Sequence, residues 1–383
     1  MSAWPGKYVI GLTGNIATGK SVVRRMLEHL GAYGIDADAL AHRAVTKDAP
    51  GYQPVVDTFG KWILAPDGQI DRAKLGRVVF SDPDALERLE AIVHPLVGQA
   101  IDILIRRSQH KVIVIEAIKL IEAGLAEKCD SLWVTFAPPG AQMARLVQKR
   151  GLSEAAARQR INAQPPQEHK TARANVVIPN DGSFEEAWRR VVAAWQASFP
   201  SDETGYTALE IERAGKAARK GAMVVQRARP RQAGEIASLI NRLSAGQHTL
   251  SHEDVMAAFG EKAFLILKVD GEPVGVVGWK VENLVACTDE VFLEAGLDSA
   301  GALNALMEEV ERVSRELQCE ISLLFLPAEL ARQNATLQKL GYQPRTVQGL
   351  GVRAWQEAAV ESMPPNTVML FKQLRQDRVL RPV

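Results

Sequence analysis

The chain has 383 residues, more than one ordinary hydrophobic core organises, which predicts two domains with a third possible. Apolar residues make up 46% and charged residues 24%, as in average globular proteins, so disordered and fibrous classes are excluded. The 46 Lys and Arg residues balance the 45 Asp and Glu residues, which excludes the basic surface that a nucleic acid or an anionic membrane needs.

Cysteine usage and the N-terminus indicate the compartment. Cys129, Cys287 and Cys319 are widely spaced and odd in number, which is typical of a reducing environment rather than of a disulfide framework. The apolar run at residues 8–12 is too short for a signal peptide, and no run approaches the roughly 18–20 residues that span a bilayer. We therefore expect a cytoplasmic protein.

The first half alternates short apolar runs with longer helical patterns. Apolar residues at spacings of three and four predict one long amphipathic helix over residues 84–107, with His94 and Pro95 at its centre. Alternating strands and helices predict an α/β domain with a doubly wound parallel sheet and helices on both faces. The predicted strands are residues 7–13, 32–35, 111–116, 131–136 and 175–178, and a helix over residues 184–199 ends the domain.

The composition changes in the middle of the chain. Residues 201–222 are charged and Ala-rich after a Pro-Ser-Asp start, which predicts a linker between domains at 1–200 and 223–383. The second domain begins with a predicted strand at residues 223–227 and a hairpin at residues 264–279 that turns at Asp270-Gly271. A helix over residues 303–317 and a strand over residues 320–326 follow, so a mixed α+β fold is expected.

The most specific motif is a phosphate-binding loop. Residues 14–21, Gly-Asn-Ile-Ala-Thr-Gly-Lys-Ser, match G-x-x-x-x-G-K-[ST] between a predicted strand and a predicted helix. In such a loop, backbone N–H groups converge on phosphate oxygens, the lysine bridges the β- and γ-phosphates, and the serine hydroxyl coordinates Mg²⁺. The sequence therefore predicts an ATP or GTP site, with Ser21 as the metal ligand and these nucleotide-binding residues: Gly14, Ala17, Thr18, Gly19, Lys20, Ser21 and Val22.

Two carboxylates follow the second predicted strand. Asp36 and Asp38 lie at the carboxyl edge of the predicted sheet, where open α/β sheets bind ligands. One of them can accept a proton from an attacking hydroxyl group. Either residue can instead cap the next helix, and that alternative stays open here.

Basic side chains and one histidine complete the chemistry that the residues alone suggest. Arg145 and Arg150 lie in a basic helical segment of the kind that closes over a triphosphate and neutralises its charge. His94 carries no strong signal by itself.

At this point the residues resemble a known family. Residues 8–199 resemble dephospho-coenzyme A kinases through motifs that cover the first domain in order. These are Gly11-Leu-Thr-Gly14 with Gly19-Lys20-Ser21, Ile35-Asp-Ala-Asp38, Asp71-Arg72-Ala-Lys-Leu-Gly76, Leu89-Glu-Ala-Ile-Val-His94-Pro95, Gln142-Met-Ala-Arg145, Arg160-Ile-Asn-Ala-Gln164 and Val177-Ile-Pro-Asn180. The resemblance implies a P-loop sheet with a helical lid and acceptor region. His42 and Ile118-Lys119 depart from the family pattern near the expected acceptor pocket.

The resemblance also implies a reaction. The γ-phosphoryl group of ATP, with Mg²⁺, would pass to the ribose 3′-hydroxyl of dephospho-coenzyme A, and Asp36 would orient and deprotonate that hydroxyl. The competing hypothesis is a P-loop regulatory module that senses nucleotide. The remaining roles are Arg150 in the lid, Asn180 near the adenine, and an acceptor site with Arg72, His94 and Glu116.

The second half resembles, more faintly, the GNAT acetyltransferase superfamily over residues 224–372. The loop that would hold the pyrophosphate of acetyl-coenzyme A, residues 296–302, contains Asp298 and no arginine. Leu337 stands near the place of the tyrosine that often serves as general acid. We therefore expect a structural or regulatory module that neither acetylates amines nor binds acetyl-coenzyme A tightly. A bifunctional protein with an active acetyltransferase domain is the alternative.

Overall fold

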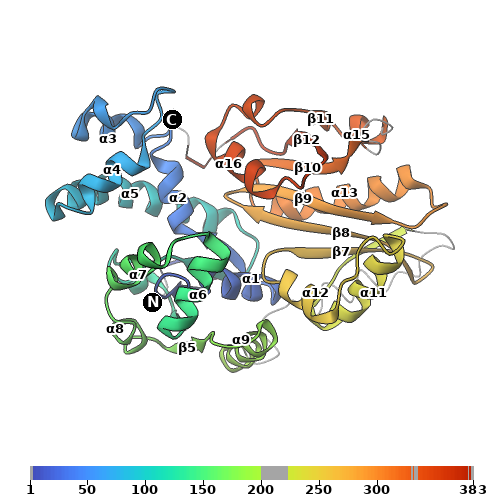
Figure 1. Ribbon diagram of the computed structural model, residues 1–383, viewed down its shortest axis with the longest axis horizontal. Coiled ribbons are helices and arrows are strands. Elements are labelled where there is room, and N and C mark those ends of the chain that lie inside the picture. The colour runs from blue at the N-terminus through green and yellow to red at the C-terminus, as the bar shows by residue number, and fades with distance from the viewer. Residues whose placement is uncertain (1–2, 200–222, 329–330, 332–334, 378, 381–383) are drawn as a thin grey trace.

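The computed structural model describes residues 3–199, 223–328, 331, 335–377 and 379–380, without the side chains of residues 149–150 (Figure 1). The predicted linker at residues 201–222 lies outside the described residues, and the domain boundaries stay a prediction. Among the described residues, no helix is both long and apolar enough to cross a bilayer.

A five-stranded parallel sheet organises the first half, as predicted. Its order is β2-β3-β1-β4-β5, so β1 lies between β3 and β4 and its carboxyl end is the centre of the ligand-binding edge. The strands are β1 (Tyr8–Thr13), β2 (Tyr33–Asp36), β3 (Val112–Glu116), β4 (Ser131–Phe136) and β5 (Val176–Pro179).

Helices cover both faces of this sheet, because each face carries buried apolar side chains. One face packs on α1 (Lys20–His29) and α9 (Phe184–Ser198), the other on α2 (Ala37–Ala44) and α5 (Pro83–Arg107). The helix predicted over residues 84–107 is confirmed as α5, which continues through Pro95.

Smaller helices follow β2 and β4 and form the acceptor and lid regions that were expected. The acceptor side has α3 (Tyr52–Phe59), α4 (Arg72–Val79) and the 3₁₀ helix η1 (Lys61–Ile63), which share an apolar cluster with the start of α5. The lid side has α6 (Pro139–Arg150), α7 (Glu154–Asn162) and α8 (Glu168–Thr171), after the 3₁₀ helix η2 (Ala126–Lys128).

The second half is a seven-stranded mixed sheet, which confirms the expected α+β class. Its order is β11-β12-β10-β9-β8-β7-β6, and β9 and β10 pair in parallel. The strands are β6 (Met223–Arg227), β7 (Ala263–Val269), β8 (Glu272–Glu282), β9 (Val285–Leu293), β10 (Ile321–Pro327), β11 (Gln343–Pro344) and β12 (Thr367–Gln373). The predicted opening strand and the hairpin at Asp270-Gly271 are confirmed.

Helices also cover this second sheet. One face packs on α13 (Ser299–Glu316) and α15 (Ala335–Lys339), and the other on α11 (Ala233–Leu243), α12 (His252–Ala258) and α16 (Arg353–Ser362). Two 3₁₀ helices, η3 (Pro230–Gln232) and η4 (Gln348–Leu350), precede α11 and α16.

The two halves pack against each other through polar and apolar contacts. The β8–β9 turn and α16 face β2 and the acceptor helices (Figure 1). Arg43 of α2 pairs with the buried Glu320, and its Nη1 donates to the Asn283 carbonyl at 2.8 Å. Leu380, near the C-terminus, belongs to the apolar cluster beneath α2 and α5. The second half therefore contributes side chains to the core of the first.

Candidate active site

The phosphate-binding loop joins β1 to α1, as its motif predicts. Gly14 and Gly19 adopt positive φ angles of 154° and 90°. A Cβ atom on Gly19 would lie 1.9 Å from Nδ2 of Asn180, so only glycine fits there. Asn180 Nδ2 donates to the Thr18 carbonyl at 2.9 Å, which places Asn180 directly on the loop. Asn180 is thus bonded directly to the loop. Within the loop, Ala17 has a left-handed φ of 57°.

The first turn of α1 holds the residues predicted to contact phosphate and metal. Lys20 is buried, and its Nζ donates to the Asn15 carbonyl at 3.2 Å. Ser21 Oγ donates to Glu116 Oε1 at 2.7 Å, so a hydroxyl and a carboxylate face each other between α1 and β3. Val22 is half-buried and packs its side chain against the apolar core.

Asp36 fits both hypotheses that the sequence left open, a helix cap and a carboxylate at the site. Its Oδ1 accepts from the Ala39 N–H at 2.8 Å, so it caps α2. The register also pairs Asp36 with Glu116 on the neighbouring strand, beside the loop. Burial and the Glu116 carboxylate raise the pKa of Asp36 to about 6, although Arg24 opposes the shift. The same residue is therefore a helix cap and a weakly acidic carboxyl group at the carboxyl edge of the sheet.

Asp38 lies two residues further on, at the same edge. Its Oδ2 accepts from the Ile118 N–H at 3.0 Å, and burial raises its pKa. The Ile118 carbonyl in turn accepts from Thr13 Oγ1 at 3.1 Å and from the buried Lys170. The segment that departs from the family pattern thus holds Asp38 through its backbone, which any side chain at position 118 can supply.

The other predicted residues lie further out. Arg72 begins α4, is exposed, and reaches Glu357 of the second half at 3.5 Å. His94 lies on the exposed side of α5, and within the described part of the chain no hydrogen bond or ion pair joins it to Asp36 or Asp38. The side chain of Arg150, at the end of α6, lies outside what the structure describes.

Two basic residues at the site, Arg24 and Lys170, carried no assigned role in the sequence, and Arg145 was expected only as part of the basic lid segment. Arg24 donates through Nε to Glu116 Oε2 at 2.7 Å and through Nη1 to Glu28 at 2.6 Å, which fixes the Glu116 carboxylate. Arg145 donates to the Ala17 carbonyl at 3.0 Å and to the Asn180 carbonyl at 2.7 Å. Burial lowers the pKa of Lys170. Arg24 follows Ser21 by one helical turn, and that spacing is the signal that could have identified it.

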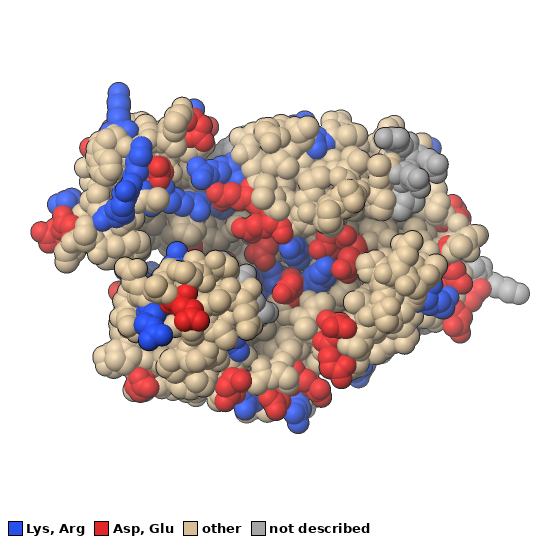
Figure 2. Space-filling view, viewed as in Figure 1, with Lys and Arg blue, Asp and Glu red and all other residues tan. Residues whose placement is uncertain are grey.

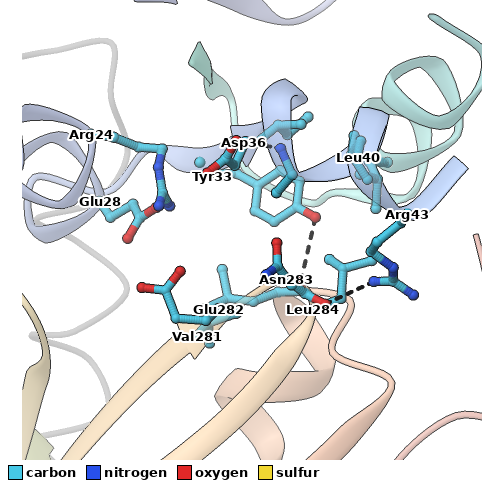
Figure 3. A pocket seen from close by; sticks show the side chains of 15 residues that line it. Arg24, Glu28, Tyr33, Asp36, Leu40, Arg43, Val281, Glu282, Asn283 and Leu284 are labelled. Atoms are coloured by element: carbon cyan, nitrogen blue, oxygen red, sulfur yellow. Dashed lines mark hydrogen bonds and ion pairs between the residues drawn. The ribbon is translucent and has the colours of Figure 1, made fainter. Parts of the chain in front are cut away.

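A small cavity of about 50 Å³ lies beside Asp36, between β2 and the β8–β9 turn (Figure 3). Arg24 and Glu28 line one end, and Arg43 lines the other, where it points toward Asn283 of the second half (Figure 3). The second half therefore closes the outer edge of the sheet next to Asp36.

The surface shows where a ligand can enter. Figure 2 shows a hollow between the acceptor helices α3–α5 and the lid helices α6 and α7, and it opens toward the region of α2. Acidic and basic side chains alternate along the boundary between the two halves in the same view. The face is mixed in sign, which agrees with the balanced composition.

In the second half, Asp298 and Leu337 are the two residues that depart from the acetyltransferase pattern. Asp298 is the N-cap residue of α13, and a Cβ atom on Gly301 would lie 2.5 Å from Asp298 Oδ2. The carboxylate thus covers the first turn of α13, where an anion would otherwise bind. Leu337 is buried in α15. Weak binding of acetyl-coenzyme A stays a prediction.

Both halves of the chain are similar to known proteins. A sequence model of the family "Dephospho-CoA kinase" matches residues 8–186. A dephospho-CoA kinase of Geobacter metallireducens is 47% identical over 191 residues, which are 49% of this chain and 95% of the relative. The dephospho-CoA kinase of Geobacter sulfurreducens is 46% identical over 195 residues, which are 50% of this chain and 99% of the relative. A solved GNAT-family acetyltransferase of Streptococcus pneumoniae matches with 13% identity and a TM-score of 0.31, covering 40% of this chain and 99% of its own.

Proposed function

The chain belongs to the dephospho-CoA kinase family, and from this premise we infer that it phosphorylates dephospho-CoA to coenzyme A with ATP as the phosphoryl donor. The observation that carries the proposal is that Asp36 pairs in register with Glu116, whose carboxylate bonds Ser21 of the phosphate-binding loop, with Asp38 on the same edge of the sheet. A nucleotide switch has no use for a carboxylate aimed at an acceptor hydroxyl, whereas a kinase requires one.

The chemistry can be assigned to this chain's own residues. Lys20 and the N–H groups of residues 14–21 neutralise the charge of the transferring phosphoryl group. Asp36 accepts the proton of the ribose 3′-hydroxyl as that oxygen attacks, and Arg24 holds Glu116 in place next to it. Lid residues, Arg150 among them, exclude water when the lid closes. Arg72 and His94 belong to the acceptor side in this proposal.

The oxygen atoms next to the phosphate-binding loop suit Mg²⁺ as ligands. Ser21 Oγ and a Glu116 oxygen lie 2.7 Å apart, and hard oxygen ligands of this kind, completed by phosphate oxygens, suit that ion. Within the described residues no group of three His, Cys, Asp or Glu side chains forms a cage of its own. Bound there, Mg²⁺ would neutralise charge on the phosphates, while Ser21 and Glu116 hold it at the loop.

The test is an assay of ADP formation by the purified full chain, coupled to a dehydrogenase readout. We expect ADP release that depends on dephospho-CoA and yields coenzyme A as the second product. Release at the same rate without dephospho-CoA, in protein that binds ATP, would contradict the proposal and favour a nucleotide-sensing module.

The raised pKa of Asp36 predicts a pH dependence. A protonated carboxyl group cannot accept a proton, and with a pKa of about 6 the protonated form persists to higher pH than for an ordinary aspartate. We therefore expect kcat/KM for dephospho-CoA to fall below about pH 6, by roughly tenfold per pH unit. The measurement is a kcat/KM profile between pH 5 and 8. A flat profile down to pH 5 would show that Asp36 is not the base.

A further inference from the structure

A groove of about 730 Å³ lies between the two halves, between the loop after α2 and helix α16. One wall carries Thr46, Lys47 and Gln69, and the other carries Gln348, Gln356 and Glu357; we call this the interdomain groove. Alignment with the Geobacter metallireducens relative uses 95% of that protein and only 49% of this chain. The α16 wall is therefore built from sequence that this relative does not have.

The interdomain groove continues from the proposed acceptor site. Asp36 caps the start of α2, and Arg43, in the last turn of the same helix, lines the groove. Asp36 and Arg43 are seven positions apart, which corresponds to a rise of about 10 Å along α2. Arg72, on the acceptor side, reaches Glu357 of the α16 wall at 3.5 Å. The interdomain groove thus begins about 10 Å along α2 from the position proposed for the acceptor hydroxyl.

The side chains that line the interdomain groove indicate which part of the acceptor it can bind. Four acidic residues of the lining outnumber its three basic residues, so the groove offers no surplus positive charge for a diphosphate. The amide side chains of Gln69, Gln348 and Gln356 suit amide groups instead. Beyond its nucleotide and diphosphate, dephospho-CoA carries an uncharged chain with two amides, the pantetheine arm.

We propose that the interdomain groove binds the pantetheine arm of dephospho-CoA, so that α16 of the second half completes the acceptor site of the kinase. The proposal rests on the proposed kinase function. In this arrangement the second half is a specificity element, since it contacts a part of the substrate that takes no part in the chemistry.

The test is a steric block of the groove in the full chain. Gln356 lines the groove, and its Nε2 donates to the Gln348 carbonyl at 3.3 Å. Gln356→Trp fills the space, and we expect KM for dephospho-CoA to rise about tenfold. We expect kcat and KM for ATP to stay within about twofold of wild type, because the lost contact stabilises the bound substrate and the transition state equally. Lys47→Trp blocks the opposite wall and serves if the first variant does not fold. The matched control is Gln338→Trp on the exposed face of α15.

Each outcome decides the proposal. A rise in KM for dephospho-CoA in the groove variants and not in Gln338→Trp supports it. Wild-type KM in a folded groove variant overturns it, as does an equal rise in KM for ATP or a loss confined to kcat. If the wild type forms no dephospho-CoA-dependent ADP, the proposed function itself fails and the groove proposal with it.

Discussion

Asp36→Asn is expected to lower kcat by about 10²–10⁴-fold while KM for ATP stays within about twofold, because loss of a general base has this size and the nucleotide does not need the carboxylate. Asparagine caps a helix as well as aspartate does, so the bond to the Ala39 N–H and the geometry of α2 persist. The loss then reports proton acceptance rather than a displaced helix. Steady-state rates with saturating ATP and varied dephospho-CoA measure it.

The matched control for this variant is Asp82→Asn. Asp82 caps α5 with a bond to the Asp84 N–H at 3.0 Å, and the exchange is chemically the same at a helix N-terminus that carries no proposed site residue. We expect wild-type kinetics for the control. Wild-type turnover in Asp36→Asn would mean that Asp36 only caps α2 and that another group takes the proton.

Glu320→Gln is expected to destabilise the folded chain by roughly 3–5 kcal/mol, because it leaves the Arg43 guanidinium buried without its partner charge. Glu320 is 1% exposed and also accepts from Trp355 Nε1 at 3.0 Å, so water cannot replace the lost charge. Arg43 belongs to α2 and Trp355 to α16, so Glu320 joins α2, the helix that Asp36 caps, to the second half. The measurement is chemical unfolding of the full chain followed by fluorescence.

Two further variants isolate the ion pair. Adding Arg43→Met to Glu320→Gln removes the unpaired charge, and we expect it to recover a large part of the lost stability. Glu316→Gln breaks an exposed pair with Arg312 on α13 and is expected to cost less than about 1 kcal/mol. A loss for Glu320→Gln as small as that for Glu316→Gln would show that Arg43 is not held in a buried pair.

Local sequence patterns were sufficient to predict the features that depend on residues close together in the chain. The loop from Gly14 to Ser21 lies on a continuous stretch of chain between one strand and one helix, so its motif is sufficient to place it. Asp36 ends a strand, and parallel strands share one carboxyl edge, so its place on the same edge as the loop also follows from the pattern. The buried strands, helix α5 and the hairpin at Asp270-Gly271 follow from apolar periodicity for the same reason.

Contacts between side chains far apart in the chain could not be predicted from such patterns. Glu116 contacts Ser21 across 95 residues, and Arg43 meets Glu320 across 277. An arginine on a helix has the same sequence signature whether it is solvated or buried, because its environment is set by whatever packs over it. The second half packs over α1, α2 and the edge strand β2 and buries Arg43 against Glu320. The acceptor side of this protein therefore depends on residues after position 280, which no local pattern could connect to Asp36.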